Sequence, residues 1–151
     1  MENLAQIRSA RPARKQVVLI IPRYPYGKDQ IFLGGSLVTV AARLMAMGHM
    51  VTMIDFNIDR LTDKSVNVSL AKADMIGISL TGAPYIPGVV ELLPALCHMA
   101  PRALVLLGGQ VIERLSPEQF AQIFQGQAVQ VKDDIDLARN LGCQVADLPD
   151  A

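Results

Sequence analysis

Side chains that could do chemistry are few and scattered in this chain of 151 residues. Its two cysteines, Cys97 and Cys143, lie far apart and outside any CxxC spacing, which argues against a zinc site, an iron–sulfur cluster and a disulfide framework. Its two histidines are expected in a turn, His49, and at a helix end, His98, where neither would stand beside a nucleophile. The chain therefore lacks the pattern of a hydrolase or a protease.

Glycines and hydroxyl residues form a more informative pattern, because they follow short apolar runs. They gather at Gly34 and Gly35, at 77–82 and at 108–110. Glycine lets the backbone come close to a flat, bulky ligand, and the amino end of a following helix can hold a phosphate. Each glycine taken alone also fits an ordinary turn, so the pattern matters only if one fold brings these positions together.

Strand-sized apolar runs alternate with segments of helical periodicity. Strands are expected at 17–21, 51–54, 75–80, 103–107 and 128–131. Helices are expected at 36–47, near 65–72, at 87–99, from the Ser116 cap to 124, and at 134–141. This alternation is typical of a parallel sheet covered by helices on both faces. We therefore predict a doubly wound α/β domain, flavodoxin-like or Rossmann-like, with five parallel strands and with ligands bound beyond the carboxyl ends of the strands.

Local signals mark several helix ends. Ser116 and Gln119 have the spacing of a capping box, with Pro117 at the first helical position. Gly48 stands where a left-handed C-terminal cap would go. Pro94 lies inside an expected helix, so we expect a kink or a restart there, because proline removes a hydrogen bond and clashes with the preceding turn.

Length and charge limit the possible partners. The length suits one domain, with 1–15 as a flexible basic arm, 16–142 as the folded domain and 143–151 as a tail or linker. The formal net charge is zero, which argues against a nucleic acid or an anionic membrane as partner. No apolar run approaches the roughly 18 residues that a membrane-spanning helix needs. We therefore expect a soluble, cytoplasmic protein.

Two other protein classes with this fold fit the sequence poorly. A nicotinamide-binding domain needs GxGxxG directly after the first strand, and Gly27 and Gly34 have the wrong spacing, although Asp55 follows the second strand as required. A receiver domain needs acidic residues after the first strand and a phosphoacceptor aspartate after the third. This chain has Pro22 and Ser79 in those places.

Three motifs in one order make the chain similar to corrinoid-binding domains of the methionine-synthase and mutase type. That family carries DxHxxG after strand one, SxL after strand three and GG after strand four. This chain has DQIFLG at 29–34, SLT at 79–81 and GG at 108–109. Ile31 replaces the family's cobalt-ligating histidine, and Thr81 replaces its leucine.

The absence of this histidine makes the chain similar to the cobalamin-binding domains that precede radical S-adenosylmethionine enzymes, where the histidine is commonly absent. Gly48–His49 and Pro117–Glu118 are similar to further landmarks of that subfamily, and the resemblance covers residues 17–125. After the fifth strand, the acidic glycine loop of the family is replaced by Lys132–Asp133–Asp134.

The resemblance implies that cobalamin is the cofactor and that it binds base-off, without a histidine ligand. The implied contacts are Asp29, Ile31, Leu33, Gly34, Gly35, Ser79, Leu80, Thr81, Gly82, Gly108, Gly109 and Gln110. It implies no metal ligand and no catalytic residue in this chain, which lacks the three-cysteine motif of a radical S-adenosylmethionine domain. Such a domain or a methyltransferase would be a separate partner. Two alternatives stay open: a cofactor-free degenerate fold that acts as an interaction or regulatory module, and an enzyme that uses a nucleotide or sugar-nucleotide.

Overall fold

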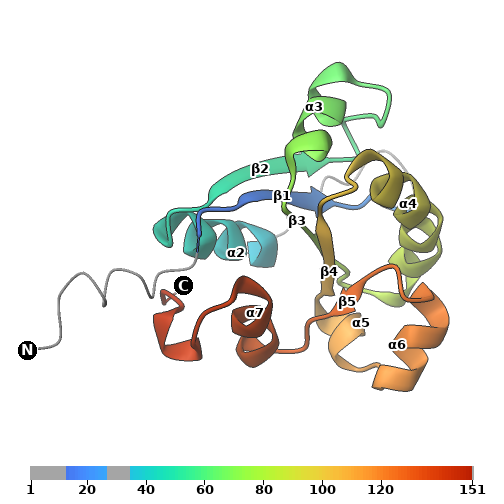
Figure 1. The fold of residues 1–151 in the computed structure, drawn as a ribbon. Helices are drawn as coiled ribbons and strands as arrows, with labels where there is room; N and C mark the ends of the chain where they lie inside the picture. The colour runs from blue at the N-terminus through green and yellow to red at the C-terminus, as the bar shows by residue number, and fades with distance from the viewer. Residues whose placement is uncertain (1–12, 27–34, 151) are drawn as a thin grey trace, which may run out of the picture.

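The computed structural model describes residues 13–26 and 35–150. Five parallel strands form one sheet in the order β2-β1-β3-β4-β5, with helices on both of its faces (Figure 1). The predicted doubly wound α/β fold is therefore confirmed. The chain leaves β1 for one edge of the sheet and then returns to β3 on the other side of β1. The carboxyl ends of β1 and β3 are therefore the switch point, where ligands bind in this fold.

The strands agree with the predicted ones to within one residue at each end. The bounds are Gln16–Ile21 for β1, Met50–Asp55 for β2, Met75–Ser79 for β3, Leu104–Gly108 for β4 and Val129–Gln130 for β5. The fifth strand is thus only a short edge. It pairs with β4 through Leu106 and Leu107, and Val131 N–H continues the ladder by donating to Leu107 O (2.9 Å).

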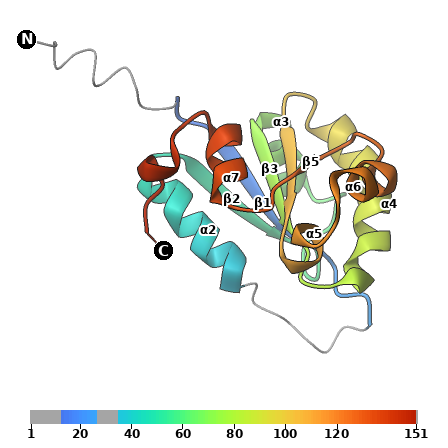
Figure 2. The same cartoon turned by 90° about the horizontal axis from the view of Figure 1, so that it is seen from below.

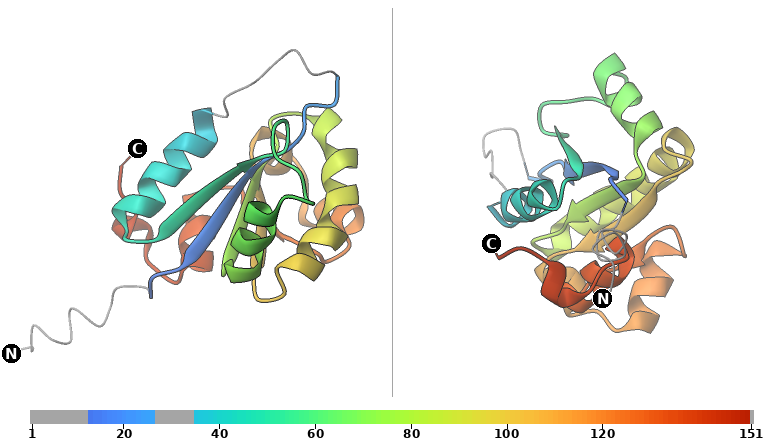
Figure 3. Two further views of the ribbon diagram at one scale, coloured as in Figure 1. Left: turned by 90° about the horizontal axis from the view of Figure 1, so that it is seen from above. Right: turned by 60° about the vertical axis from the view of Figure 1, so that its left-hand side comes forward.

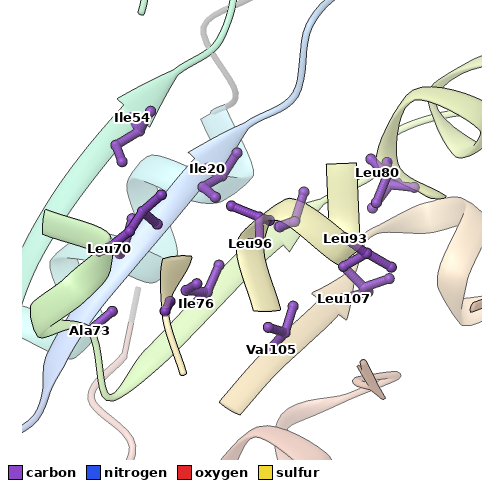
Figure 4. Close-up of a cluster of buried hydrophobic side chains, with 14 of the residues drawn as sticks. Ile20, Ile54, Leu70, Ala73, Ile76, Leu80, Leu93, Leu96, Val105 and Leu107 are labelled. Carbon is purple, nitrogen blue, oxygen red and sulfur yellow. The ribbon is translucent and has the colours of Figure 1, made fainter. Parts of the chain in front are cut away.

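Two apolar clusters hold helices against opposite faces of the sheet (Figure 2). Successive strand residues point to opposite faces, and here both sets are apolar. One face, the α2–α7 face, packs against α2 (Gly35–Ala46) and α7 (Asp134–Leu141) through Leu37, Leu44 and Leu141. The other, the α4 face, packs against α3 (Lys64–Lys72), α4 (Ile86–Met99) and α6 (Pro117–Phe124). Figure 4 shows part of the cluster on the α4 face, including Ile76, Leu93 and Leu107.

The predicted capping signals are present at the N-terminus of α6 and after the C-terminus of α2. Ser116 Oγ accepts a hydrogen bond from Gln119 N–H (3.1 Å), and Gln119 Oε1 accepts one from Ser116 N–H (2.9 Å), so the capping box of α6 is complete. Gly48, after α2, has φ 91°, a left-handed conformation that favours glycine. The restart expected at Pro94 is not found, because α4 runs through it as one helix.

Two short elements were not predicted. A turn of 3-10 helix, η1 (Ala83–Tyr85), leads into α4, and a four-residue helix, α5 (Gln110–Glu113), directly follows β4. Both are too short to show a helical period in the sequence. They fix the backbone directly after β3 and β4, where the candidate site lies.

The two predicted terminal segments stand as follows. Residues 1–12 of the expected arm lie outside the described residues, while Lys15 N–H donates to His49 Nδ1 (3.0 Å). The expected tail contains a 3-10 turn, η2 (Val145–Asp147), and returns to α2, where Arg43 Nε donates to Pro149 O (3.0 Å). Figure 3 shows this end of the chain beside α2. Within residues 13–26 and 35–150, no helix is long and apolar enough to cross a membrane.

Candidate ligand-binding site

Two of the predicted site residues stand side by side at the carboxyl ends of neighbouring strands. Ser79 ends β3 and Gly108 ends β4, and the register of the sheet makes them direct partners. Leu80 N–H donates to Gly108 O (2.8 Å), which extends the ladder by one residue. The Ser79 hydroxyl has no hydrogen-bond partner among the described residues, so it is available to a ligand.

Gly109 is required by the backbone rather than by a ligand alone. Its φ is +103°, and a Cβ atom there would collide with the backbone carbonyl of Leu80. At Gly108, by contrast, a Cβ atom would lie 3.6 Å from Val131 O, which is an ordinary van der Waals contact. The two adjacent glycines therefore have different reasons to be glycine: Gly109 shapes the turn, and Gly108 leaves space.

That space belongs to a cavity of about 240 Å³ between the sheet and the helices of the α2–α7 face. We call it the α2–α7 cavity. Its lining is Val17, Leu19, Leu37, Val40, Arg43, Leu44, Met75, Gly77, Ile78, Ser79, Leu106, Gly108, Gly109, Glu113, Val131, Lys132, Asp133, Asp134 and Leu137. Apolar side chains predominate, and the charged ones come from α2, from α5, from the segment between β5 and α7, and from the first residue of α7.

Small residues on one face of the sheet account for this cavity. Gly77, Ser79 and Gly108 alternate with larger residues along β3 and β4, so all three belong to the α2–α7 face. On the α4 face, the neighbouring positions carry Ile78 and Leu107, which are fully buried. At Gly77 the place of the missing side chain is taken by Leu19, whose Cδ2 lies 2.8 Å from where a Cβ would be, whereas Ser79 and Gly108 leave space that the helices above do not fill.

An ion pair joins the two helices that cover the cavity. The Arg43 guanidinium on α2 donates two hydrogen bonds to the Asp134 carboxylate on α7, each 3.1 Å long. The Arg43 side chain is only 15% exposed, and its Nε also holds Pro149 O. Arg43 is thus fully engaged, whereas the ammonium group of Lys132 makes no ion pair within the described residues. Lys132 is therefore the cation in the lining that can meet an anionic ligand.

The remaining predicted site residues have different positions. Asp29, Ile31, Leu33 and Gly34 lie outside the described residues, and Gly35 is the first residue of α2. Leu80 is fully buried on the α4 face, so its side chain points away from the α2–α7 cavity. Thr81, Gly82 and Gln110 follow the strands as expected but do not line the cavity.

Sequence reasoning missed several residues that line the cavity. Gly77 was noted only as part of a glycine-rich stretch, although a glycine in the middle of a strand often marks a close approach or a missing side chain. Leu37, Val40 and Leu44 have the helical spacing of a core-facing stripe. That spacing could not show that they face a gap.

Titratable groups with a shifted pKa lie away from this cavity. Burial, and secondarily the charge of Lys15, lowers the pKa of His49, whose Nε2 has no partner among the described residues. Burial, and secondarily the charge of Asp147, raises the pKa of the Cys143 thiol. In the described part of the chain, no cluster of three or more histidine, cysteine or acidic residues could hold a metal ion. The cavity therefore offers apolar contact, the Ser79 hydroxyl, the Lys132 ammonium group and the Glu113 carboxylate, and neither of these two charged groups makes an ion pair among the described residues.

Comparisons with known proteins add little to this description. No protein-family model matches the chain, and no curated protein matches it. Among solved structures, it is similar to a protein from Parabacteroides merdae described as a GDSL-like lipase, at 11% identity, covering 89% of this chain and 78% of that chain, with a TM-score of 0.42. A similarity this loose carries no argument about function, so the fold assignment depends on the sheet topology and the site on its own geometry.

Proposed function

We propose that this domain binds cobalamin, with the base of the nucleotide tail held in the α2–α7 cavity. The observation that carries the proposal is the cavity itself. It opens beside Ser79 and Gly108, two of the motif positions to which the resemblance to corrinoid-binding domains points. At about 240 Å³ it is smaller than the roughly 300–1,000 Å³ of sites that enclose a whole small molecule. A cavity of this size suits one flat group of a larger ligand.

The chemistry of the lining fits a benzimidazole base and its linking phosphate. Apolar residues such as Leu19 and Leu106 would contact the flat faces of the ring. Gly108 leaves room for the ring edge, and the Ser79 hydroxyl can donate to a ring nitrogen or to an oxygen of the tail. Lys132 can neutralise the phosphate.

The corrin ring itself would lie outside the cavity, over the carboxyl ends of the strands. Ile31, which the resemblance places below the cobalt, has no lone pair to donate, and a base held in the cavity cannot ligate the metal either. Neither this chain nor the base would then supply a nitrogen ligand to the cobalt. Bound cobalamin would supply a cobalt centre for methyl transfer or one-electron chemistry to a separate catalytic domain. This chain's own part is to bind and orient the cofactor.

Retention of the cofactor tests the proposal directly. The purified protein is mixed with hydroxocobalamin, desalted and examined for a retained visible spectrum. The reduced cobalt(II) form is then examined by electron paramagnetic resonance. We expect a retained spectrum and no superhyperfine splitting from an axial nitrogen. A colourless protein contradicts cobalamin binding and favours the cofactor-free interaction module, while nitrogen splitting contradicts the buried base.

A pair of variants tests the cavity separately. Gly108→Leu should weaken cobalamin binding roughly 10-fold or more, because the new side chain occupies the space proposed for the base. Ala71→Leu is the control: Ala71 is an exposed residue of α3, on the opposite face of the sheet, and it does not line this cavity. Both variants are checked for folding by circular dichroism. Equal affinity of folded Gly108→Leu and wild type would remove the cavity from the proposal.

A further inference from the structure

A second cavity lies on the other side of the switch point, between the ends of β1 and β2 and the start of α4. It measures about 680 Å³, within the roughly 300–1,000 Å³ range typical of small-molecule sites. We call it the tyrosine cavity. Its lining is Pro22, Arg23, Tyr24, Phe56, Asn57, Ile58, Asp59, Arg60, Leu61, Tyr85, Gly88, Val89, Glu91 and Leu92. None of these residues lines the α2–α7 cavity.

The loops that form this cavity are held in place by hydrogen bonds. Asn57 Oδ1 accepts from Tyr24 N–H (2.7 Å), and Asn57 Nδ2 donates to Pro22 O (3.3 Å) and to Asp55 Oδ1 (2.8 Å). Asp59 Oδ2 accepts from Asp55 N–H (3.0 Å). The segment after β1 and the loop after β2, which can be followed in Figure 3, are thus tied together before any ligand binds. A pre-formed site loses less entropy on binding than one that must be ordered.

One side of the cavity is aromatic and apolar. The Tyr24 and Tyr85 rings pack edge to face with centroids 6.3 Å apart, and Phe56, Leu61 and Val89 add apolar surface. Gly88 on α4 has no Cβ, and nothing lies within 4 Å of where one would be. This surface suits a flat ring, because aromatic and apolar side chains make favourable contacts with a flat aromatic group.

Two arginines in the lining of the same cavity supply positive charge. Arg23 follows β1 and Arg60 follows β2; both are exposed, and neither makes an ion pair within the described residues. Of the two acidic residues in the lining, Asp59 already accepts a backbone hydrogen bond, and Glu91 lies on α4. An unengaged guanidinium binds phosphate or carboxylate with paired, charge-assisted hydrogen bonds.

We propose that the tyrosine cavity binds a small ligand in which a flat aromatic ring is joined to a phosphate or a carboxylate. The ring contacts Tyr24, Tyr85 and Phe56, and the anionic group contacts Arg23 and Arg60. Glu91 can accept a hydrogen bond from an amino or hydroxyl group of the same ligand. The residues of this site are different from those of the α2–α7 cavity, so the proposal does not rest on cobalamin binding.

The composition of the chain provides a local probe. It has no tryptophan and three tyrosines, and the rings of Tyr24 and Tyr26 are also close, with centroids 5.9 Å apart. All tyrosine emission therefore comes from this region. Binding constants are measured by calorimetry for adenosine monophosphate, benzoate, adenosine and inorganic phosphate, and tyrosine emission reports whether each ligand reaches the cavity.

We expect a ligand with both features, adenosine monophosphate or benzoate, to bind and to change the tyrosine emission. Adenosine and inorganic phosphate, with one feature each, should bind about 10-fold more weakly or worse. The tighter of the two complete ligands identifies the anionic group as phosphate or carboxylate. Failure of both complete ligands at millimolar concentration, or equal affinity for adenosine and adenosine monophosphate, overturns the proposal.

The arginines are tested by removing their charges. The double variant Arg23→Gln/Arg60→Gln should weaken binding of the complete ligand about 10-fold or more. Arg114→Gln, which removes an exposed arginine outside this cavity, is the matched control and should bind like wild type. If the double variant and the control lost the same amount of ligand affinity, the loss would come from the change in net charge, and the proposed contacts of Arg23 and Arg60 would be wrong. Retained cobalamin binding in the double variant would confirm that the two cavities are independent.

Discussion

The two faces of the sheet are built from the same strands but differ in how well they are packed. On the α4 face, large side chains from the strands meet large ones from the helices, and eighteen of the described residues form a cluster in which each is at most 5% exposed. On the α2–α7 face, Ser79 and Gly108 leave a cavity of about 240 Å³. Because β3 and β4 belong to both faces, strand propensity cannot explain the difference. Side-chain size on alternate residues can: the α4 face is closely packed over the strands, and its cavity lies among the loops beyond the strand ends, whereas the α2–α7 face leaves space over the strands themselves.

The largest expected difference in stability between the two faces comes from alanine substitutions at two adjacent leucines in β4. Leu107 points to the α4 face and is fully buried, whereas Leu106 points to the α2–α7 cavity. Leu107→Ala should lower the free energy of unfolding by about 3 kcal/mol, because it creates a new void in close-packed surroundings. Leu106→Ala should cost less than about 2 kcal/mol, because it widens a space that already exists. Urea denaturation measures both, and equal losses would show that the two faces are packed alike.

The two adjacent glycines give a smaller effect. Gly109→Ala should destabilise the domain by about 2 kcal/mol, because alanine is strained at φ +103° and its Cβ would strike the Leu80 backbone. Gly108→Ala should stay within about 0.5 kcal/mol of wild type, because its Cβ only touches Val131 O and projects toward the cavity. Thermal and urea unfolding of the two variants compare them. A strongly destabilised Gly108→Ala would mean that the space beside it is not available to a ligand.

The smallest expected effect is a pH dependence of folding stability, which arises from His49, a residue outside the apolar clusters of both faces. His49 is buried outside both apolar clusters, and burial, with the charge of Lys15 as a lesser cause, lowers its pKa below the ordinary value of 6.5. The unfolded chain therefore takes up a proton first as the pH falls. The contribution of His49 to stability is present above about pH 6.5 and is lost as the pH falls through the lower folded-state pKa.

Unfolding curves at about pH 7 and pH 5 measure this effect in wild type and in both leucine variants. We expect the same loss in all three, since distant sites contribute additively. His49→Asn should reduce the loss, because it removes the group whose pKa is lowered by burial. A different loss in the Leu106 and Leu107 variants would show that His49 is coupled to one face.

The fold was predictable because each local signal agreed with the others. The strands of the α/β alternation, the capping box at Ser116 and the left-handed Gly48 were all read correctly from residue types. The restart expected at Pro94 was wrong. Leu93 and Leu96, both fully buried on either side of it, anchor α4 as one helix. Propensity was overridden there by tertiary packing.

The site was only partly predictable. Ser79, Gly108 and Gly109 were found because they follow strands, and the topology brings such positions together. Gly77 and Lys132 were missed as site residues because their importance depends on which face of the sheet is left open. The tyrosine cavity was missed for a similar reason: Arg23, Arg60 and Tyr85 come from three separate segments with no shared motif.

The Arg43–Asp134 pair also has a consequence for the order in which the molecule forms. The two residues are 91 positions apart, so the α2–α7 face closes only after nearly the whole domain has been synthesised. The α4 face, by contrast, is made of successive units and can assemble as the chain emerges. A helix that docks last over a loosely filled space is also the one expected to detach at the lowest cost. Detachment of α7 would therefore open the α2–α7 cavity while the other face keeps the sheet folded.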